Sequence, residues 1–187
     1  MELKITTNFP DIQRQLNGLR RDIAEKATAR AVNRTMEQAR TDMSREIRQE
    51  FNITAAKVRE KLFLRRAGFK GGQLSIEAAL LSQTKNGRRS INLINFQARQ
   101  NAQGVAVKVK RAGGRKTIKG AFIGNKGRTV FKRRGKSRLP IDPLQTIDVP
   151  MMFNTRKINN AVVRKIKEKF PAIWEREVRF YTQRLGR

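Results

Sequence analysis

The chain has 187 residues, of which 43 are Lys or Arg and 15 are Asp or Glu, giving a formal net charge of +28. A hydrophobic fraction of 38% can supply a core and argues against a fully disordered chain. The sequence has no Cys and no His, which excludes disulfides, thiolate chemistry and the commonest general base and metal ligand. We therefore expect a protein that is not an enzyme, that uses no cofactor or metal, and that has an acidic partner.

Other features of the sequence argue against a membrane protein, a secreted protein and a carboxylate-based catalytic or metal site. No apolar run approaches the roughly 18 residues of a membrane span, so no membrane partner is expected. The segment Met1–Ile5 does not have the pattern of a secretory signal. Asp142 and Asp148 lie on either side of Pro143, but two isolated carboxylates are too few to predict a catalytic pair or a metal site.

The positive charge is concentrated in the middle of the chain. Residues 78–141 carry 17 basic side chains and no acidic one. Residues 1–77 have a net charge of +6 and residues 142–187 a net charge of +5. The centre of the sequence is therefore a basic module between two segments of ordinary charged-helix composition.

The first segment is predicted to be helical. Apolar or small residues recur at spacings of three and four over about eleven turns, with Gly18 as the weak point. This stripe consists of Ile12, Leu16, Leu19, Ile23, Ala27, Ala31, Thr35, Ala39, Met43, Ile47 and Phe51. Two alternatives stay open: a helix that breaks near Gly18 and packs on its own sheet, or a helix that also packs against neighbouring subunits.

A shorter helix is predicted to follow the long one. Either Asn52 or Thr54 can cap its first turn, because both side chains accept hydrogen bonds from free backbone N–H groups. The helix is expected to continue to Leu62 and to direct Val58, Leu62 and Phe63 inward.

The central segment is predicted to form strands. Residues alternate in character over 74–80 and 105–110, and briefly over 91–93, with Lys108 and Lys110 expected to point outward. Two further strands, at 121–123 and 129–131, are joined by a glycine-rich turn. Because the connections are short, we expect one antiparallel sheet of four to five strands with basic turns.

The last segment is helical again, with Pro171 predicted to cause a kink or a restart near Lys169. The whole order, helices followed by strands and a helix, predicts an α+β fold. We expect a single domain over residues 1–187, organised as a helical segment (1–66), a basic β module (67–149) and a C-terminal helix (150–187).

The basic cluster of the central segment is the candidate binding site. Cationic side chains on long stems near glycine-rich tips can bind phosphates or acidic protein surfaces. The candidate residues are Lys108, Lys110, Arg111, Arg115, Lys116, Lys119, Lys126, Arg128, Lys132, Arg133, Arg134, Lys136 and Arg138. No zinc finger or aromatic RNA-binding motif accompanies them, so base-specific recognition is not expected. The alternative interpretation is a solvated or protein-facing basic surface.

Short motifs in this region resemble those of a known family. They are Gly120-Ala121-Phe122-Ile123, Val130-Phe131-Lys132-Arg133, Arg138-Leu139-Pro140-Ile141 and, before the last helix, Val149-Pro150-Met151-Met152. The segment Ala31-Val32-Asn33-Arg34-Thr35 resembles the family's N-terminal helix, and residues 59–66 its following basic stretch. In this order they resemble tailed-phage minor tail proteins of the Z type, also called tail completion proteins, over roughly residues 20–185. The family-motif residues expected in the core are Gly120, Ala121, Phe122, Ile123, Phe131, Pro140 and Ile141.

The resemblance implies a structural virion protein at the head-proximal end of a phage tail, the neck, that helps to join the tail to a DNA-filled head. It implies a homo-oligomeric ring, such as a hexamer, assembled in the host cytoplasm. The implied partners are the tail terminator, tail tube or head-tail connector proteins and genomic double-stranded DNA. Composition alone also fits a nucleic-acid-binding protein associated with the ribosome or the nucleoid, without sequence specificity.

Overall fold

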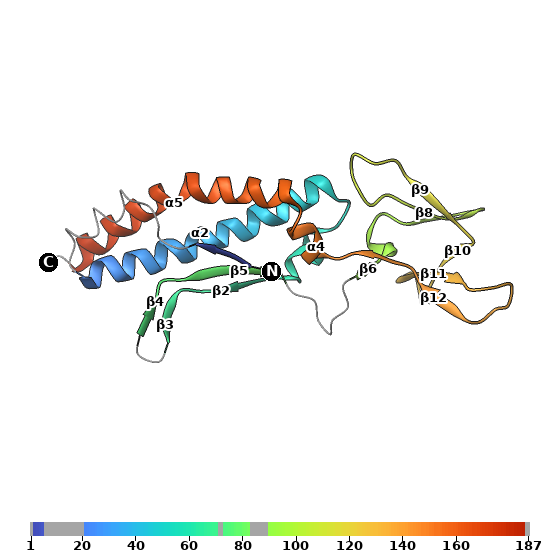
Figure 1. The fold of residues 1–187 in the computed structure, drawn as a ribbon, viewed down its shortest axis with the longest axis horizontal. Helices are drawn as coiled ribbons and strands as arrows, with labels where there is room; N and C mark the ends of the chain where they lie inside the picture. Colours follow the sequence, from blue (N-terminus) through green and yellow to red (C-terminus); the bar gives the residue numbers. More distant parts are fainter. Residues whose placement is uncertain (1, 6–20, 71–72, 83–89, 186–187) are drawn as a thin grey trace. The chain divides into compact units, whose positions relative to one another are not determined.

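A computed structural model describes residues 2–5, 21–70, 73–82 and 90–185 (Figure 1). The fold is α+β, as predicted, with two helices of 30 residues each, α2 (Arg21–Glu50) and α5 (Arg156–Leu185). The chain forms two compact units. Unit 1 comprises Met1–Met43, Leu62–Ser82 and Arg156–Arg187, and unit 2 comprises Ser44–Lys61 and Gln83–Thr155.

The strands between the two long helices are short and antiparallel. They are β2 (Leu62–Arg65), β3 (Gly68–Lys70), β4 (Gln73–Ser75), β5 (Ala78–Ser82), β6 (Ser90–Asn92), β7 (Arg99–Asn101), β8 (Gly104–Val107), β9 (Lys116–Lys119), β10 (Ala121–Gly124), β11 (Thr129–Arg133), β12 (Ile141–Pro143) and β13 (Gln145–Ile147), preceded in the chain by β1 (Glu2–Ile5). The short helices are α3 (Ala55–Arg59), η2 (Leu93–Asn95) and α4 (Val149–Phe153).

Within the described residues, the strands form several small sheets, not the one sheet of four to five strands that the sequence predicted. Their orders are β1-β5-β2 and β3-β4 in unit 1, and β13-β6, β7-β8-β9 and β10-β11-β12 in unit 2. Sheets β7-β8-β9, β10-β11-β12 and β3-β4 each pair strands that are consecutive in the chain, and no pairing among the described strands joins one sheet to another. The presence of strands in this segment was therefore predicted better than the way in which the strands assemble into sheets.

The predicted apolar stripe of α2 is confirmed where the structure describes it. Its buried members are Ile23, Ala27, Ala31, Thr35, Ala39, Met43 and Ile47. Buried Thr35 satisfies its hydroxyl by donating to the carbonyl of Ala31 one turn earlier, at 2.8 Å. The earlier members of the stripe and Gly18 lie outside the described residues.

In unit 1, α5 packs antiparallel to α2 (Figure 1). The indole N–H of Trp174 donates to the hydroxyl of Thr28 at 3.1 Å, and Lys169 pairs with buried Asp42 at 2.7 Å. The helix does not restart at Pro171, which lies inside it. Pro171 removes only one backbone donor, and burial of neighbouring residues such as Phe170 holds the turn together.

The β1-β5-β2 sheet supplies the rest of the unit 1 core. In β5, Ala78 and Leu80 are fully buried. Leu62, expected to end the short helix, instead begins β2, and α3 ends at Arg59. The prediction that Phe63 points inward is wrong. Successive strand residues face opposite sides, so burial of Leu62 leaves the Phe63 ring 43% exposed.

The predicted capping residue and hairpin are confirmed in unit 2. The side chain of Thr54 accepts a hydrogen bond from the backbone N–H of Lys57 and caps α3. Strands β10 and β11 pair in register, and the turn between them has positive φ at Asn125, Lys126 and Gly127. Strand β8 differs from the prediction. All its residues are buried, and Lys108 follows the strand.

Two asparagine side chains each bind both backbone groups of one distant residue. In unit 1, Asn33 of α2 donates to the carbonyl of Ala67 at 2.9 Å and accepts from its N–H at 2.8 Å. In unit 2, Asn92 makes the same pair of bonds to Val130 of β11, at 3.2 and 2.9 Å. We call each of these an amide clamp. In each clamp one side-chain amide satisfies both the N–H and the carbonyl of a single backbone residue.

Candidate functional site

The thirteen predicted basic residues, here called the basic β surface, all lie in unit 2. Six lie on the β8–β9 connection and on β9: Lys108, Lys110, Arg111, Arg115, Lys116 and Lys119. Seven lie on the β10–β11 turn, β11 and the loop to β12: Lys126, Arg128, Lys132, Arg133, Arg134, Lys136 and Arg138. All are exposed except Lys108, which is half-buried.

The two groups belong to different sheets that one side chain ties together. The amide of Gln100 on β7 donates to the carbonyl of Gly104 at 2.9 Å and accepts from the N–H of Ile123 on β10, also at 2.9 Å. The backbone of Gly104 leaves no space for a side chain, because a Cβ there would lie 2.1 Å from the carbonyl oxygen of Ile118. The basic β surface is therefore mounted on two closely joined sheets.

Two arginines of the β8–β9 connection anchor it to the rest of unit 2. Arg111 donates from Nε to the carbonyl of Arg48 at 2.6 Å, and its backbone N–H bonds to the carbonyl of Glu50 at 2.8 Å. Arg115 donates to the carbonyl of Gln97 at 2.8 Å. The bonds of Arg111 place a cation near the carbonyl end of α2, where positive charge is favourable.

One cation of the basic β surface has a carboxylate partner in the described part of the chain. Arg134 makes a bidentate pair with Asp142, at 2.7 Å from Nε and 2.9 Å from Nη2. The hydrogen bonds from Arg134 lower the pKa of Asp142 below its usual value, and the same bonds raise the pKa of Arg134. Asp148 instead accepts a hydrogen bond from Val149 and caps α4. The two aspartates thus have separate structural roles.

The motif aromatics of β10 and β11 lie on one face of their sheet. Phe122 and Phe131 are register partners whose ring centroids are 5.9 Å apart. The guanidinium of Arg133 lies 5.1 Å from the Phe122 ring centroid. Both rings are half-buried, so the prediction that they are core residues is wrong for this chain on its own. The opposite face is the buried one, because Ala121 and Val130 point there.

The other motif residues occupy distinct places around this sheet. Gly120 adopts a positive φ of 72° in the turn before β10, which favours glycine. Ile123 and Ile141 are half-buried, whereas Pro140, preceded by a cis peptide bond, is exposed. Of the seven residues predicted to form the core, Ala121 is buried.

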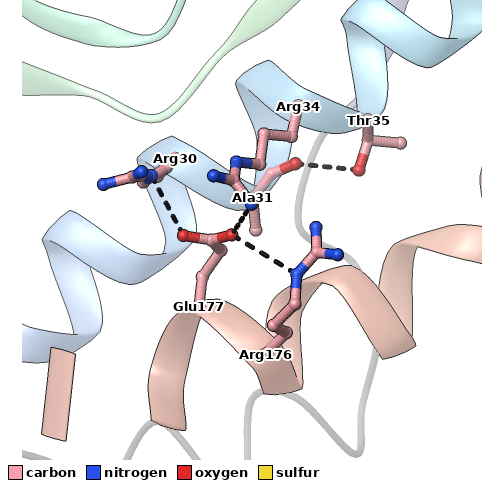
Figure 2. Close-up of polar contacts among 6 residues, drawn as sticks. All are labelled: Arg30, Ala31, Arg34, Thr35, Arg176 and Glu177. Carbon is pink, nitrogen blue, oxygen red and sulfur yellow. Dashed lines mark hydrogen bonds and ion pairs between the residues drawn. The ribbon is translucent and has the colours of Figure 1, made fainter. Parts of the chain in front are cut away.

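A second charged site, in unit 1, was missed by the sequence analysis. Figure 2 shows buried Glu177 of α5 among three arginines. Its carboxylate lies 3.1 Å from Arg30 Nε, 2.6 Å from Arg34 Nη1 and 3.7 Å from Arg176 Nε. One local signal was present: Glu177 occupies a position of the apolar stripe of the last helix. Its partners could not be found without knowing how the two long helices align.

The described residues show no cluster of three or more His, Cys, Asp or Glu side chains that could hold a metal ion. Nor does any helix in this part of the chain combine the length and the apolarity needed to cross a membrane. The chemistry that both charged sites offer is the binding of anionic groups by arginine and lysine.

Comparison with protein families identifies the class of this protein as a structural component of a phage tail. The family model described as prophage minor tail protein Z (GPZ) matches residues 11–185, nearly the whole chain. The chain therefore belongs to the phage minor tail protein Z family. Comparisons with curated proteins and with solved structures give no significant match.

Proposed function

We propose that this minor tail protein is a tail completion component at the neck, where it helps to join the tail to a DNA-filled head. The observation that supports the proposal is that the basic β surface has many exposed cations but few carboxylate partners among the described residues. Of its thirteen cations, Arg134 is the one with a carboxylate partner among the described residues. So many exposed charges without counter-ions favour a protein that works against acidic surfaces.

We propose further that most of these cations face acidic proteins, not DNA. In a ring of six subunits, the segment 78–141 would bring about 100 positive charges. A ring about 40 Å thick would face only about 24 phosphates of duplex DNA in its channel. DNA could then neutralise about a quarter of the charge. Tail terminator, tail tube or connector proteins are the proposed acidic neighbours, and DNA in the channel is a minor one.

Charge reversal on assembled tails tests this proposal. The test variant carries Lys132→Glu, Lys136→Glu and Arg138→Glu, which leaves the Arg134–Asp142 pair intact. The control variant carries Arg156→Glu, Lys167→Glu and Arg179→Glu on α5, with the same change in charge at exposed positions. Each is supplied to phage lacking the protein, and its binding to DNA-free tails and the joining of heads are measured.

We expect the test variant to fail to bind DNA-free tails while the control binds them. Normal binding of the test variant, with failure only when heads deliver DNA, would assign the surface to DNA. Electron microscopy of labelled wild-type protein checks the position independently. Label at the distal end of the tail would overturn the neck assignment.

A further inference from the structure

Unit 1 contains a hollow that neither the basic β surface nor the neck proposal involves. Its volume is about 420 Å³, and it lies between α2, the turn from β2 to β3 and the end of α5. The residues that matter for its chemistry are Lys26, Arg30, Arg34, Glu37, Arg66 and Tyr181. We call it the unit 1 hollow. Its volume is that of a site for a side chain or a small ligand.

The lining of the hollow is strongly cationic. Four of its residues are basic and one, Glu37, is acidic, and that carboxylate pairs with Arg66 at 2.6 Å. Arg30 and Arg34 both form an ion pair with the same carboxylate, that of Glu177. Each contacts that carboxylate within ion-pair distance, and each side chain remains about 40% exposed. Because a guanidinium has five N–H donors, both arginines keep donors for a further anion.

The arginines of the hollow are held in position before any ligand arrives. Glu177 is buried and cannot move far, so it fixes the heads of Arg30 and Arg34 (Figure 2). Arg30 also lies 5.1 Å from the ring centroid of Phe180 and 6.0 Å from that of Tyr181. Fixed guanidinium groups lose less conformational entropy on binding than free ones.

The third arginine of the hollow, Arg66, is restrained as well. Arg66 precedes Ala67, whose backbone the amide clamp of Asn33 binds on both sides. The ion pair with Glu37 restrains the Arg66 side chain from the same helix. Three restrained arginines, Arg30, Arg34 and Arg66, therefore line one small space.

We infer that the unit 1 hollow binds the carboxylate of an acidic side chain from a neighbouring tail protein. Planar guanidinium groups match the two oxygens of a carboxylate. The small volume admits a side chain and excludes a DNA duplex. The inference does not depend on the neck position, because any contact partner in the tail can supply the side chain.

The test uses the isolated full-length protein and observes each arginine separately. The probe is the blocked dipeptide acetyl-Glu-Glu-amide, with acetyl-Gln-Gln-amide as the uncharged control, at fixed ionic strength. The Nε–Hε signals of Arg30, Arg34 and Arg66 are followed by NMR during titration. Arg128 and Arg138 report, in the same sample, non-specific attraction to the basic β surface.

We expect a saturable shift of the hollow arginines at probe concentrations that leave Arg128 and Arg138 unchanged. Arg66→Gln should weaken this binding about tenfold, the effect of one charge-assisted hydrogen bond. Arg164→Gln is the matched control, since Arg164 is also an exposed arginine paired with one glutamate, Glu168. It should leave the affinity unchanged.

Three results would overturn the inference. The first is a shift of the hollow arginines that does not saturate or that appears together with the shift of Arg128. The second is an equal loss of affinity in the Arg66 and Arg164 variants. The third is equal or tighter binding of inorganic phosphate at the hollow, which would replace the carboxylate by a phosphate as the ligand.

Discussion

The indole N–H of Trp174 and the hydroxyl of Thr28 form a buried hydrogen bond of 3.1 Å that joins the two long helices of unit 1. Both residues are almost completely removed from solvent. Thr28→Val keeps the shape of the side chain but leaves the indole donor without its partner. We expect it to lower the free energy of unfolding by about 1–3 kcal/mol, measured by urea denaturation. An unchanged free energy would mean that the bond contributes nothing net.

Removing the charge of Glu177 should destabilise unit 1 through repulsion. In Glu177→Gln, Arg30, Arg34 and Arg176 would face one another without their shared anion. Since the arginine heads remain partly solvated, we expect a loss of about 1–3 kcal/mol that added salt partly reverses. Glu175→Gln on the same helix is the control, because that side chain is exposed. Equal effects of the two variants would contradict this role of Glu177.

Half-buried Phe131 should matter more for assembly than for folding. We expect Phe131→Ala to cost about 1–2 kcal/mol, less than the about 3–5 kcal/mol of a core phenylalanine. Phe96→Ala, at a fully buried position of the same unit, should show the larger cost. Thermal unfolding measures stability, and binding to tails measures assembly. A Phe131 variant as unstable as the Phe96 variant would show that its ring belongs to the core.

The pair of Arg134 and Asp142 should respond to acid. Because the pKa of Asp142 is lowered in the folded chain, the pair contributes stability above the unfolded pKa, and this contribution is lost as pH falls through the folded pKa. NMR titration of the Asp142 carboxyl should give a midpoint below 3.8, the ordinary value. In Arg134→Gln the midpoint should move up towards it. A midpoint that does not change would show that the pair does not form in solution.

Local patterns in the sequence were read correctly where they depend on nearby residues. The buried stripe from Ile23 to Ile47 follows from the helical period, and the β10–β11 hairpin follows from its glycine-rich turn. The helical capping role of Thr54 is equally local. Each of these features depends on residues within about one helical turn or one hairpin, so it can be predicted from the sequence alone.

The errors concern contacts between distant parts of the chain. Phe63 was assigned to the wrong face because the pairing of β2 with the later strand β5, where Phe63 is opposite Leu81, decides which side is buried. The cluster at Glu177 depends on the alignment of α5 with α2, across more than 140 residues. The basic residues were found by composition, but the partner of Arg134 appears only when β11 and β12 pair.

The amide clamps of Asn33 and Asn92 have a consequence for hydrogen exchange. The N–H groups of Ala67 and Val130 bond to side chains, so their protection against deuterium depends on a rotamer as well as on the backbone. Rotation of the asparagine side chain would expose each N–H without opening a strand. The N–H groups of Ala67 and Val130 should therefore exchange by small local fluctuations, and denaturant should hardly accelerate their exchange. In Asn33→Asp, the side chain could no longer donate to the carbonyl of Ala67 but could still accept from its N–H. Exchange at Ala67 and Val130 would therefore report the side-chain motion of one asparagine each, separately from the opening of the surrounding fold.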